Sequence, residues 1–317
     1  MAEKVYVLCA TDENYAPYCG VMLTSVFENT PNAEAFVFIS NSLSELNKKR
    51  YQQLEEQYDT SIHFIVVDKS HFRGMPIGLG AWTIESYYRF AAPELLPKEI
   101  EKVIYLDCDI IVNCDLHELW EIPINNNSAL VALDMAIYNK SVLLKHLDPH
   151  YHTEYFNSGM MIINLKYWRE HNIQKQLLEK AKETVDTNVY VDQDVLNMVL
   201  SKTKKLVSLE YNFMPALYSF AYYNTFPKDI KKQVLHIQPK IIHYTNSLVR
   251  PWFAPSYGLP FRSLWWQYLK KSPWKHLREK YPKSKRLNWW IKRNFFAPFG
   301  FFVNNNTIIS QVRNIKI

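Results

Sequence analysis

The sequence predicts an α/β fold with a mostly parallel central sheet, and two patterns support that prediction. Short apolar runs alternate with amphipathic helical stretches from about residue 5 to residue 200, which is the spacing of strand–helix–strand units. Four of the apolar runs end at an aspartate, and open α/β sheets bind ligands at the edge where their parallel strands end. The four aspartates are Asp12, Asp68, Asp107 and Asp134. We therefore expect a ligand site along this edge.

The first hundred residues predict three strands and three helices. Strands are expected at residues 5–10, 36–39 and 62–67, and helices at about 17–29, 42–58 and 83–93. Ser42 and Glu45 have the spacing of a capping box, which predicts the start of the second helix. Thr83 is the expected N-cap of the third helix, which carries Arg89 and stops at Pro93.

The middle of the chain continues the pattern and then becomes less regular. Strands are expected at residues 103–107, 129–133, 155–165 and 241–244, and helices at about 166–184 and 190–200. Gly159 lies inside the third of these strands, where glycine indicates either the close approach of another group or a β-bulge. Asp192 is the expected N-cap of the second helix.

Asp107 and Asp109 follow the buried strand Val103–Leu106 with one residue between them. In extended backbone, residues two apart point the same way, so both carboxylates converge while Cys108 faces the opposite side. Two carboxylates at the ligand-binding edge suit a divalent cation that holds phosphates. The alternative is a turn or helix-cap role, which aspartate often has where a strand ends. By itself, His243 at the end of the late strand is more typical of a packed core histidine than of a ligand.

The charge is distributed unevenly along the chain. Residues 257–317 hold 13 of the 37 Lys and Arg and a single acid, Glu279, whereas the other 256 residues carry 24 basic and 30 acidic side chains. Five of the nine Trp also fall in this basic tail (residues 257–317). We therefore expect a catalytic body at 1–256 and a basic, aromatic, helical tail at 257–317.

The chain shows no sign of secretion or of a membrane span. Met1 to Lys4 lead directly into an apolar strand without a basic leader, so no signal peptide is expected. No apolar run approaches the roughly 18 residues that a transmembrane helix needs. The four cysteines form no C-x-x-C pair, which indicates reduced, packed thiols in a cytoplasmic protein.

Six motifs in order resemble glycosyltransferase family 8, the retaining nucleotide-sugar transferases, and above all its bacterial lipooligosaccharide galactosyltransferases and lipopolysaccharide glucosyltransferases. The motifs are Ala-Thr-Asp12-Glu-Asn14, Tyr-Tyr-Arg89, Tyr-Leu-Asp107-Cys108-Asp109, Phe-Asn157-Ser158-Gly159, Asp192-Gln193-Asp194 and His243-Tyr, the last followed by Arg250-Pro-Trp. Six ordered motifs are far more specific than any one of them. The resemblance implies a single Rossmann-like nucleotide-binding domain of the GT-A type, with a mixed, mostly parallel sheet.

The resemblance also implies a metal site and a donor site. Asp107, Asp109 and His243 would bind Mn²⁺, with Mg²⁺ as the alternative, and an imidazole ligand beside carboxylates favours Mn²⁺. The donor would be UDP-galactose or UDP-glucose. The residues that the resemblance places around the donor are Ala10, Asp12, Asn14, Arg89, Asp107, Cys108, Asp109, Asn157, Ser158, Asp192, Gln193, His243 and Arg250. Arg250 stands where relatives often have Lys, and the spacing after His243 differs from theirs.

Three residues would contribute to catalysis by the same resemblance. Gln193 would lie on the β-face of the anomeric carbon, where an amide oxygen stabilises positive charge. Asp192 would hold the hexose, and Asp134 would lie near the sugar and the acceptor. Because an amide is a poor nucleophile, same-face attack is favoured, in which the departing phosphate takes the acceptor's proton.

The basic tail predicts attachment to an anionic membrane surface. Aromatic side chains alternate with Lys and Arg in it, as in peripheral membrane anchors. The expected protein is therefore a cytoplasmic enzyme, peripheral on the inner face of the cell membrane, whose acceptor is a lipid-linked glycan. For residues 261–269 the alternative is a helix packed on the body. Nucleic acid is not an expected partner, because the body is acidic and contains no reader motif.

Three other functions remain open from the sequence. A nucleotidyltransferase would also use paired aspartates on a metal ion, but it would release pyrophosphate. A non-catalytic glycan-binding or scaffold protein of the same fold would show no metal-dependent affinity for UDP. A self-glucosylating, glycogenin-like enzyme would modify its own tyrosines, of which the chain has 21.

Overall fold

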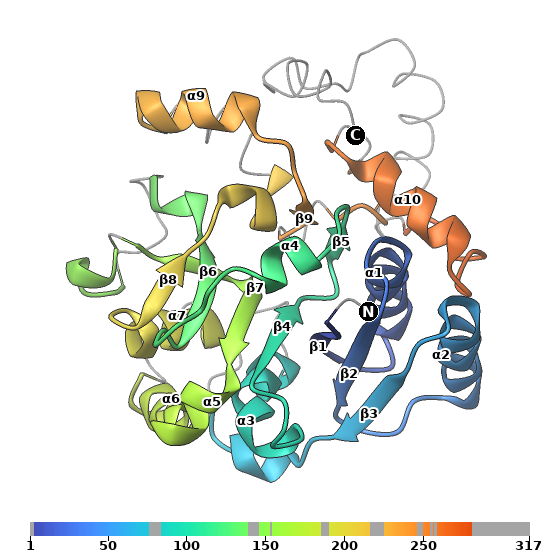
Figure 1. Cartoon of the computed structure of the whole chain (residues 1–317), viewed down its shortest axis with the longest axis horizontal. Coiled ribbons are helices and arrows are strands. Elements are labelled where there is room, and N and C mark those ends of the chain that lie inside the picture. The colour runs from blue at the N-terminus through green and yellow to red at the C-terminus, as the bar shows by residue number, and fades with distance from the viewer. Residues whose placement is uncertain are drawn as a thin grey trace.

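A seven-stranded mixed sheet forms the centre of the molecule (Figure 1). The computed structural model describes residues 3–75, 84–138, 146–152, 154–184, 190–215, 225–245, 250–253, 256 and 259–280. The strand order in the main sheet is β3-β2-β1-β4-β7-β6-β8. Its strands are β1 (Val5–Thr11), β2 (Ala33–Ile39), β3 (Ile62–Val66), β4 (Lys102–Leu106), β6 (Ala129–Leu133), β7 (Phe156–Asn164) and β8 (Lys204–Leu206).

The strand directions place one edge of the sheet at the candidate site. β1, β2, β3 and β4 pair in parallel, whereas β7 runs antiparallel to both β4 and β6. The carboxyl ends of β1, β4 and β6 and the amino end of β7 therefore share an edge. β2 pairs with one side of β1 and β4 pairs with the other, so the strand order reverses between β1 and β4. Open α/β sheets bind ligands at the carboxyl ends of the strands at such a switch point. The predicted α/β class with a mixed, mostly parallel sheet is confirmed.

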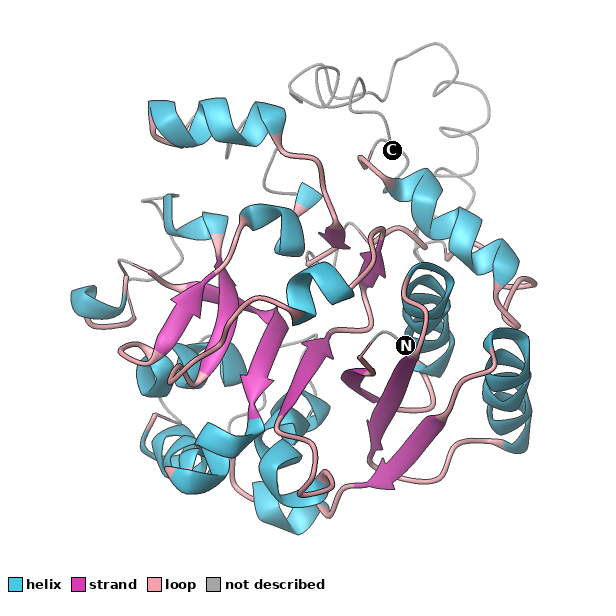
Figure 2. Cartoon of the chain, in the orientation of Figure 1, coloured by secondary structure: helices cyan, strands magenta, loops and turns pink. Residues whose placement is uncertain are grey.

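Alternation along the strands gives the sheet two apolar faces. On β1, Val5, Val7 and Cys9 face one core cluster, and Leu8 faces the other. The first cluster contains residues of α1 (Ala16–Asn29), α2 (Glu45–Tyr58), α4 (His117–Trp120) and α10 (Arg262–Lys271). The second contains residues of η2 (Ile84–Ala91), α3 (Ala92–Leu95), α5 (Leu165–Glu170), α6 (Ile173–Glu183) and α7 (Val191–Leu200). Figure 2 shows the helices on either side of the sheet.

A two-stranded sheet lies beside the main one and carries part of the site. β5 (Ile110–Val112) begins just after the acidic pair and runs antiparallel to β9 (Ile241–His243). Ile110 pairs with His243, so the register brings the late histidine next to Asp109. The 3-10 helix η5 (Leu209–Asn212) packs against β9. Helix α9 (Lys228–His236) precedes β9 and lies at the top of Figure 1.

Three helix boundaries differ from those that the sequence predicts. Ser44, not Ser42, caps α2, and its side chain accepts a hydrogen bond from the Asn47 amide. Pro93 does not stop the helix near Arg89: η2 is a 3-10 helix, and Pro93 lies in the first turn of α3, where its missing N–H costs no bond. The expected helix at 166–184 is two helices, α5 and α6, which a turn around Asn172 separates.

Helix α10 lies within the basic tail and packs on α1. Its residues Leu264, Trp265, Tyr268 and Leu269 are buried, and the Tyr268 hydroxyl accepts a hydrogen bond from Asn29 Nδ2 (2.6 Å). Of the two alternatives for 261–269, the structure thus has the helix packed on the body. Residues 281–317 lie outside the described part of the chain, so the role of the tail at a membrane stays a prediction. Among the described residues, no helix combines the length and the apolarity that crossing a bilayer requires.

Candidate functional site

The acidic pair lies in a turn between β4 and β5. The Ile110 amide donates to Asp107 O (3.3 Å), so Asp107, Cys108 and Asp109 are not in the extended backbone that the spacing predicts. The thiol of Cys108 still faces away from the carboxylates, and it donates to Ala10 O (3.1 Å). Its contact with Cys19, together with burial, raises the pKa of the Cys108 thiol well above the ordinary value. Cys108 is therefore a packed thiol on the core side of the turn.

His243 reaches the acidic pair from the other end of the chain. Its Nε2 atom lies 3.2 Å from Asp109 Oδ1 and 3.6 Å from Asp107 Oδ2. One ligand atom from each of Asp107, Asp109 and His243 lies within 4.8 Å of the other two. Two carboxylates and one imidazole, mostly buried, are a donor set that fits Mn²⁺. The structure therefore brings together the three residues expected to hold a metal ion.

Gly159 gives this cluster its space. A Cβ atom on Gly159 would lie 2.0 Å from His243 Cε1 and 2.8 Å from Asp107 Oδ2, so any larger residue would collide with both ligands. The pairing of β6 with β7 also shifts register here, because Val131 pairs with Met161 and the next residue already pairs with Asn157. Both expectations for Gly159 therefore hold: a close approach within an irregular strand.

Arg250 forms an ion pair with the second aspartate of the acidic pair. Its Nη2 atom lies 3.1 Å from Asp109 Oδ2, and its guanidinium lies over the rings of Tyr15 and Trp252. Burial alone would raise the pKa of Asp109, but Arg250 and His243 together lower it below the ordinary value. The carboxylate is thus held in its ionised form, which is the form that binds cations.

Arg89 joins the acidic turn to the Asp-Gln-Asp motif. Its Nη2 atom donates to Asp107 Oδ1 (3.0 Å), its Nε atom lies 3.2 Å from Asp192 Oδ2, and its Nη1 atom donates to Ser158 O. Burial would lower the pKa of this guanidinium, yet the carboxylates of Asp192 and Asp107 raise it above its ordinary value. Arg89 is only 3% exposed and lies over the Tyr105 ring. It therefore acts as a fixed positive charge between two carboxylates.

Asp192 lies in the first turn of α7 but does not cap that helix. Tyr190 is the N-cap and makes no side-chain cap bond, so the capping role expected for Asp192 is wrong. Its carboxylate instead faces Arg89, and Ser158 Oγ donates to it at 3.4 Å. Burial raises the pKa of Asp192 to about 6, although Arg89 opposes the shift.

Gln193 is held by hydrogen bonds on both ends of its amide. The oxygen Oε1 accepts from the Ser158 amide (3.1 Å) and from Asn157 Nδ2 (3.1 Å). The nitrogen Nε2 donates to Asp134 Oδ2 (3.1 Å) and to the Tyr155 hydroxyl (3.2 Å). Asp134 lies at the end of β6 and is buried. These residues form one network with the acidic turn at the expected sheet edge.

Asp12 and Asn14 lie in the loop after β1, the strand next to β4. Asp12 Oδ1 accepts from the Tyr15 amide (2.7 Å) and Oδ2 accepts from Asn14 Nδ2 (3.1 Å), so both side chains organise the start of α1. The Tyr15 hydroxyl in turn accepts from Arg250 Nη1 (3.4 Å), which links this loop to the acidic pair. Asp68, by contrast, follows the edge strand β3, is exposed, and caps the 3-10 helix Lys69–Phe72.

The structure adds two residues, Asn212 and Tyr155, that the sequence did not single out as site residues, and it gives Asp194 of the Asp-Gln-Asp motif a partner. Asn212 Oδ1 lies 2.9 Å from His243 Nδ1, and the Asn212 side chain is 1% exposed. The Tyr155 hydroxyl donates to Asp194 Oδ1 (2.6 Å) and accepts from Gln193. Asn212 lies in a single 3-10 turn without periodic neighbours, which offers no sequence signal. Tyr155 directly precedes the Phe-Asn157-Ser158-Gly159 motif, and that position is the sequence signal that could have found it.

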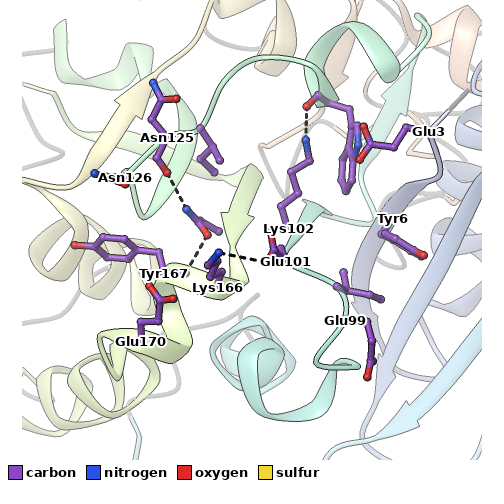
Figure 3. Close-up of a pocket in the computed structure, with 14 residues that line it drawn as sticks. Glu3, Tyr6, Glu99, Glu101, Lys102, Asn125, Asn126, Lys166, Tyr167 and Glu170 are labelled. Atoms are coloured by element: carbon purple, nitrogen blue, oxygen red, sulfur yellow. Dashed lines mark hydrogen bonds and ion pairs between the residues drawn. The ribbon is translucent and has the colours of Figure 1, made fainter.

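A second hollow of about 610 Å³ lies at the opposite edge of the sheet, around the start of β4 and the end of β7 (Figure 3). Both of its lysines are engaged: Lys166 Nζ lies 3.4 Å from Glu101 Oε1, and Lys102 Nζ donates to Trp120 O (2.8 Å). None of the residues expected at the site lines this hollow. It is therefore separate from the candidate site.

Comparison with known proteins identifies the relatives of this chain. The model of the family described as Glycosyl transferase family 8 matches residues 6–255. A putative glycosyltransferase of Haemophilus influenzae is 29% identical over 68% of this chain and 64% of that protein. A lipopolysaccharide 1,3-galactosyltransferase of Salmonella typhimurium is 28% identical over 87% of this chain and 80% of that protein. The crystal structure of the galactosyltransferase LgtC with donor and acceptor sugar analogs has the same fold, with a TM-score of 0.74, 24% identity and coverage of 89% and 99% of the two chains.

Proposed function

Because the chain belongs to glycosyltransferase family 8, we propose that it is a metal-dependent, retaining hexosyltransferase. Its donor is UDP-galactose or UDP-glucose, and its acceptor is a lipooligosaccharide, lipopolysaccharide or other cell-surface glycan. The observation that carries this proposal is the convergence of Asp107, Asp109 and His243 within 4.8 Å. Two relatives support the choice of hexose and acceptor: the lipopolysaccharide 1,3-galactosyltransferase of Salmonella typhimurium and a lipopolysaccharide 1,2-glucosyltransferase of Escherichia coli, which is 23% identical to this chain.

Asp107, Asp109 and His243 would hold Mn²⁺, with Mg²⁺ as the alternative ion. When bound, the ion neutralises charge on the diphosphate and makes UDP a better leaving group. Arg250 supports the same task, since its guanidinium lies beside Asp109 and is suited to bidentate contact with phosphate oxygens. Ala10, Cys108, Asp12 and Asn14, at the ends of β1 and β4, are the proposed contacts of the nucleoside.

Arg89 and Asp192 would shape the hexose pocket together. Arg89 spans Asp107 and Asp192, so it fixes both carboxylates and lowers their mutual repulsion. In the ionised form, Asp192 has an acceptor oxygen for a sugar hydroxyl. Ser158 and Asn157 are neighbours on β7. Ser158 Oγ donates to the Asp192 carboxylate, and Asn157 Nδ2 donates to Gln193 Oε1.

Gln193 is the proposed residue beside the anomeric carbon. Its amide oxygen is held by two donors, Ser158 N and Asn157 Nδ2, so its negative dipole end has a fixed position. A fixed dipole stabilises positive charge that develops in the transition state without reorganisation. An amide does not readily form a covalent glycosyl intermediate, which favours attack on the same face. Asp134, which accepts a hydrogen bond from Gln193 Nε2, is the proposed contact of the acceptor hydroxyl.

The basic tail would attach the enzyme to an anionic membrane surface on the cytoplasmic side. Its 13 Lys and Arg and the Trp pair at 289–290 support this, since basic and aromatic residues together bind anionic interfaces. Co-sedimentation of the full chain with phosphatidylglycerol vesicles tests it. Binding that persists with phosphatidylcholine vesicles in 1 M salt, or no binding to either, would contradict the electrostatic part.

The experiment that tests the proposed function is a donor screen. The protein is incubated with UDP-galactose or UDP-glucose and Mn²⁺, without acceptor, and the products are identified. Release of UDP and free hexose, abolished by EDTA, is expected. Pyrophosphate among the products would indicate a nucleotidyltransferase, sugar on the protein's own tyrosines would indicate self-glucosylation, and no metal-dependent UDP affinity would indicate a binding protein.

A further inference from the structure

A line of buried side-chain amides connects the proposed metal site with the proposed hexose site. His243 Nδ1 lies 2.9 Å from Asn212 Oδ1, and Asn212 Nδ2 donates to Asn157 Oδ1 (3.0 Å). Asn157 Nδ2 then donates to Gln193 Oε1 (3.1 Å). His243, Asn212 and Asn157 are 3%, 1% and 7% exposed, so water does not replace these bonds.

The direction of every bond in this line is set by the backbone of β7. The Gly159 amide donates to Asn157 Oδ1 (3.1 Å), and a backbone N–H can only donate. The atom that faces Asn212 is therefore an oxygen, and Asn212 must present its NH₂ group to it. The Asn212 oxygen is then left to face His243 Nδ1, and because a carbonyl oxygen only accepts, Nδ1 must carry a hydrogen.

This tautomer is the one that metal binding requires. With the hydrogen on Nδ1, a neutral imidazole has its lone pair on Nε2, the atom that lies 3.2 Å from Asp109 Oδ1. If the Asn212 amide were reversed, Nδ1 would have to accept and Nε2 would carry the hydrogen towards the ion. Partners on the outer side of a ligating histidine commonly fix its tautomer and ring orientation in this way.

The same line orients the group proposed to act at the sugar. The Ser158 amide donates to Gln193 Oε1 (3.1 Å), which fixes the Gln193 amide by the same rule. Asn157 contacts this oxygen with its Nδ2 atom, so Asn157 has one end on Asn212 and the other on Gln193. Displacement of Asn212 therefore also shifts Gln193 through Asn157, and displacement of Gln193 shifts Asn212.

We propose that Asn212 is a positioning residue that holds His243 in the Nδ1–H tautomer and couples the metal site to Gln193 through Asn157. This inference rests on the proposed function, because it assigns the role of the bond between Asn212 and His243 within that metal site. It assigns Asn212 no contact with substrate.

Two variants separate the two roles of Asn212. Asn212→Leu keeps the branched shape of the side chain and removes both hydrogen bonds. Asn212→Asp keeps an acceptor for His243 Nδ1–H but turns a second oxygen towards Asn157 Oδ1. Asn164→Leu is the matched control, since Asn164 is also a buried amide of β7 whose two ends are hydrogen-bonded, to Asn127 O and to the Tyr167 amide, at the opposite edge of the sheet from the site.

The readout is Mn²⁺ affinity without nucleotide, measured at pH 8 by paramagnetic resonance of the free ion. Asn212→Leu is expected to bind Mn²⁺ on the order of 10–100-fold more weakly. Asn212→Asp is expected to bind at least as tightly as the unaltered protein but to hydrolyse donor with a lower kcat, because Asn157 and Gln193 are displaced. Asn164→Leu should change neither quantity.

The outcomes distinguish this inference from the proposed function. If a folded Asn212→Leu protein binds Mn²⁺ as the unaltered protein does, or if Asn212→Asp binds as weakly as Asn212→Leu, the assigned role of Asn212 is wrong while the metal site stands. If the unaltered protein binds no Mn²⁺, both the proposed function and this inference fall. Thermal unfolding of each variant establishes that it is folded, and the Asp variant supplies the test if the Leu variant does not fold.

Discussion

His243 Nε2 lies 3.2 Å from Asp109 Oδ1, although the two residues come from different thirds of the chain. The antiparallel pairing of β5 with β9 produces this contact, because it places His243 directly opposite Ile110. A contact that depends on two short strands fixes the geometry of all three proposed metal ligands. The predictions below therefore concern this cluster and the residues that surround it.

Gly159→Ala should abolish Mn²⁺ binding while the protein stays folded. The added Cβ would lie 2.0 Å from His243 Cε1, so the ring must leave its position beside the carboxylates. Calorimetric titration with Mn²⁺ measures the effect. The control is Gly20→Ala, whose Cβ would meet the Trp274 ring at 2.1 Å: it should lower stability and leave Mn²⁺ affinity unchanged in the folded protein. Equal Mn²⁺ affinity in Gly159→Ala and the unaltered protein would contradict the assigned geometry.

Arg250→Gln should shift the affinities for metal and nucleotide in opposite directions. The guanidinium lies 3.1 Å from Asp109 Oδ2 and competes with a cation for that carboxylate, so its removal should tighten Mn²⁺ binding without nucleotide. Loss of the proposed charged hydrogen bond between Arg250 and the diphosphate should weaken UDP binding by about 2 kcal/mol, roughly thirty-fold. Both constants come from titration calorimetry. Arg250→Lys should keep most of the charge effect, and weaker Mn²⁺ binding in Arg250→Gln would count against the pairing.

The unfolding free energy of the metal-free protein should depend on pH through the titration of Asp192. Burial raises its pKa to about 6 from an ordinary value of 3.8, so the folded protein binds an extra proton between these pH values. The contribution of Asp192 therefore improves as the pH falls from 6 to 4, and above pH 6 the buried charge costs about 3 kcal/mol. The gap in unfolding free energy between Asp192→Asn and the unaltered protein should thus shrink from pH 8 to pH 4. Urea unfolding in EDTA measures it, and a constant gap would contradict the shift.

Gln193→Ala should reduce donor turnover more than donor binding. The Gln193 oxygen is aligned by Ser158 N and Asn157 Nδ2, and its proposed role is confined to the transition state. A fall in kcat on the order of 10²–10³ with little change in KM is expected for the loss of such a group. Steady-state UDP release provides both constants. A rise in KM at constant kcat would instead make Gln193 a binding residue.

The sequence predicted the fold, and the convergence of the candidate residues at one sheet edge, better than it predicted their local geometry. The alternation of apolar runs and the aspartates at their ends indicated the sheet edge, and the family that the motifs resemble is confirmed by the match over residues 6–255. The capping role of Asp192 was wrong because a stronger partner, Arg89, binds its carboxylate. The acidic pair converges through a turn instead of an extended strand, which spacing alone does not distinguish.

Residues that act through one another were the hardest to predict. Asn212 lies in a short 3-10 turn, and its importance arises only when β9 and β7 bring His243 and Asn157 to either side of it. Pro93 predicts the end of the helix that carries Arg89, yet it lies in the first turn of α3, where a proline is well tolerated. Such roles depend on tertiary contacts between distant segments, which neither periodicity nor local propensity encodes.

The most direct test of the central claim is UDP release from UDP-galactose and UDP-glucose as a function of Mn²⁺, compared between the unaltered protein and Asp109→Asn. This substitution keeps the size of the side chain and removes the charge that Arg250 and His243 hold ionised. We predict Mn²⁺-dependent release in the unaltered protein and its near-complete loss in Asp109→Asn. Unchanged, metal-dependent release in Asp109→Asn would contradict the assignment of Asp107, Asp109 and His243 as the metal site.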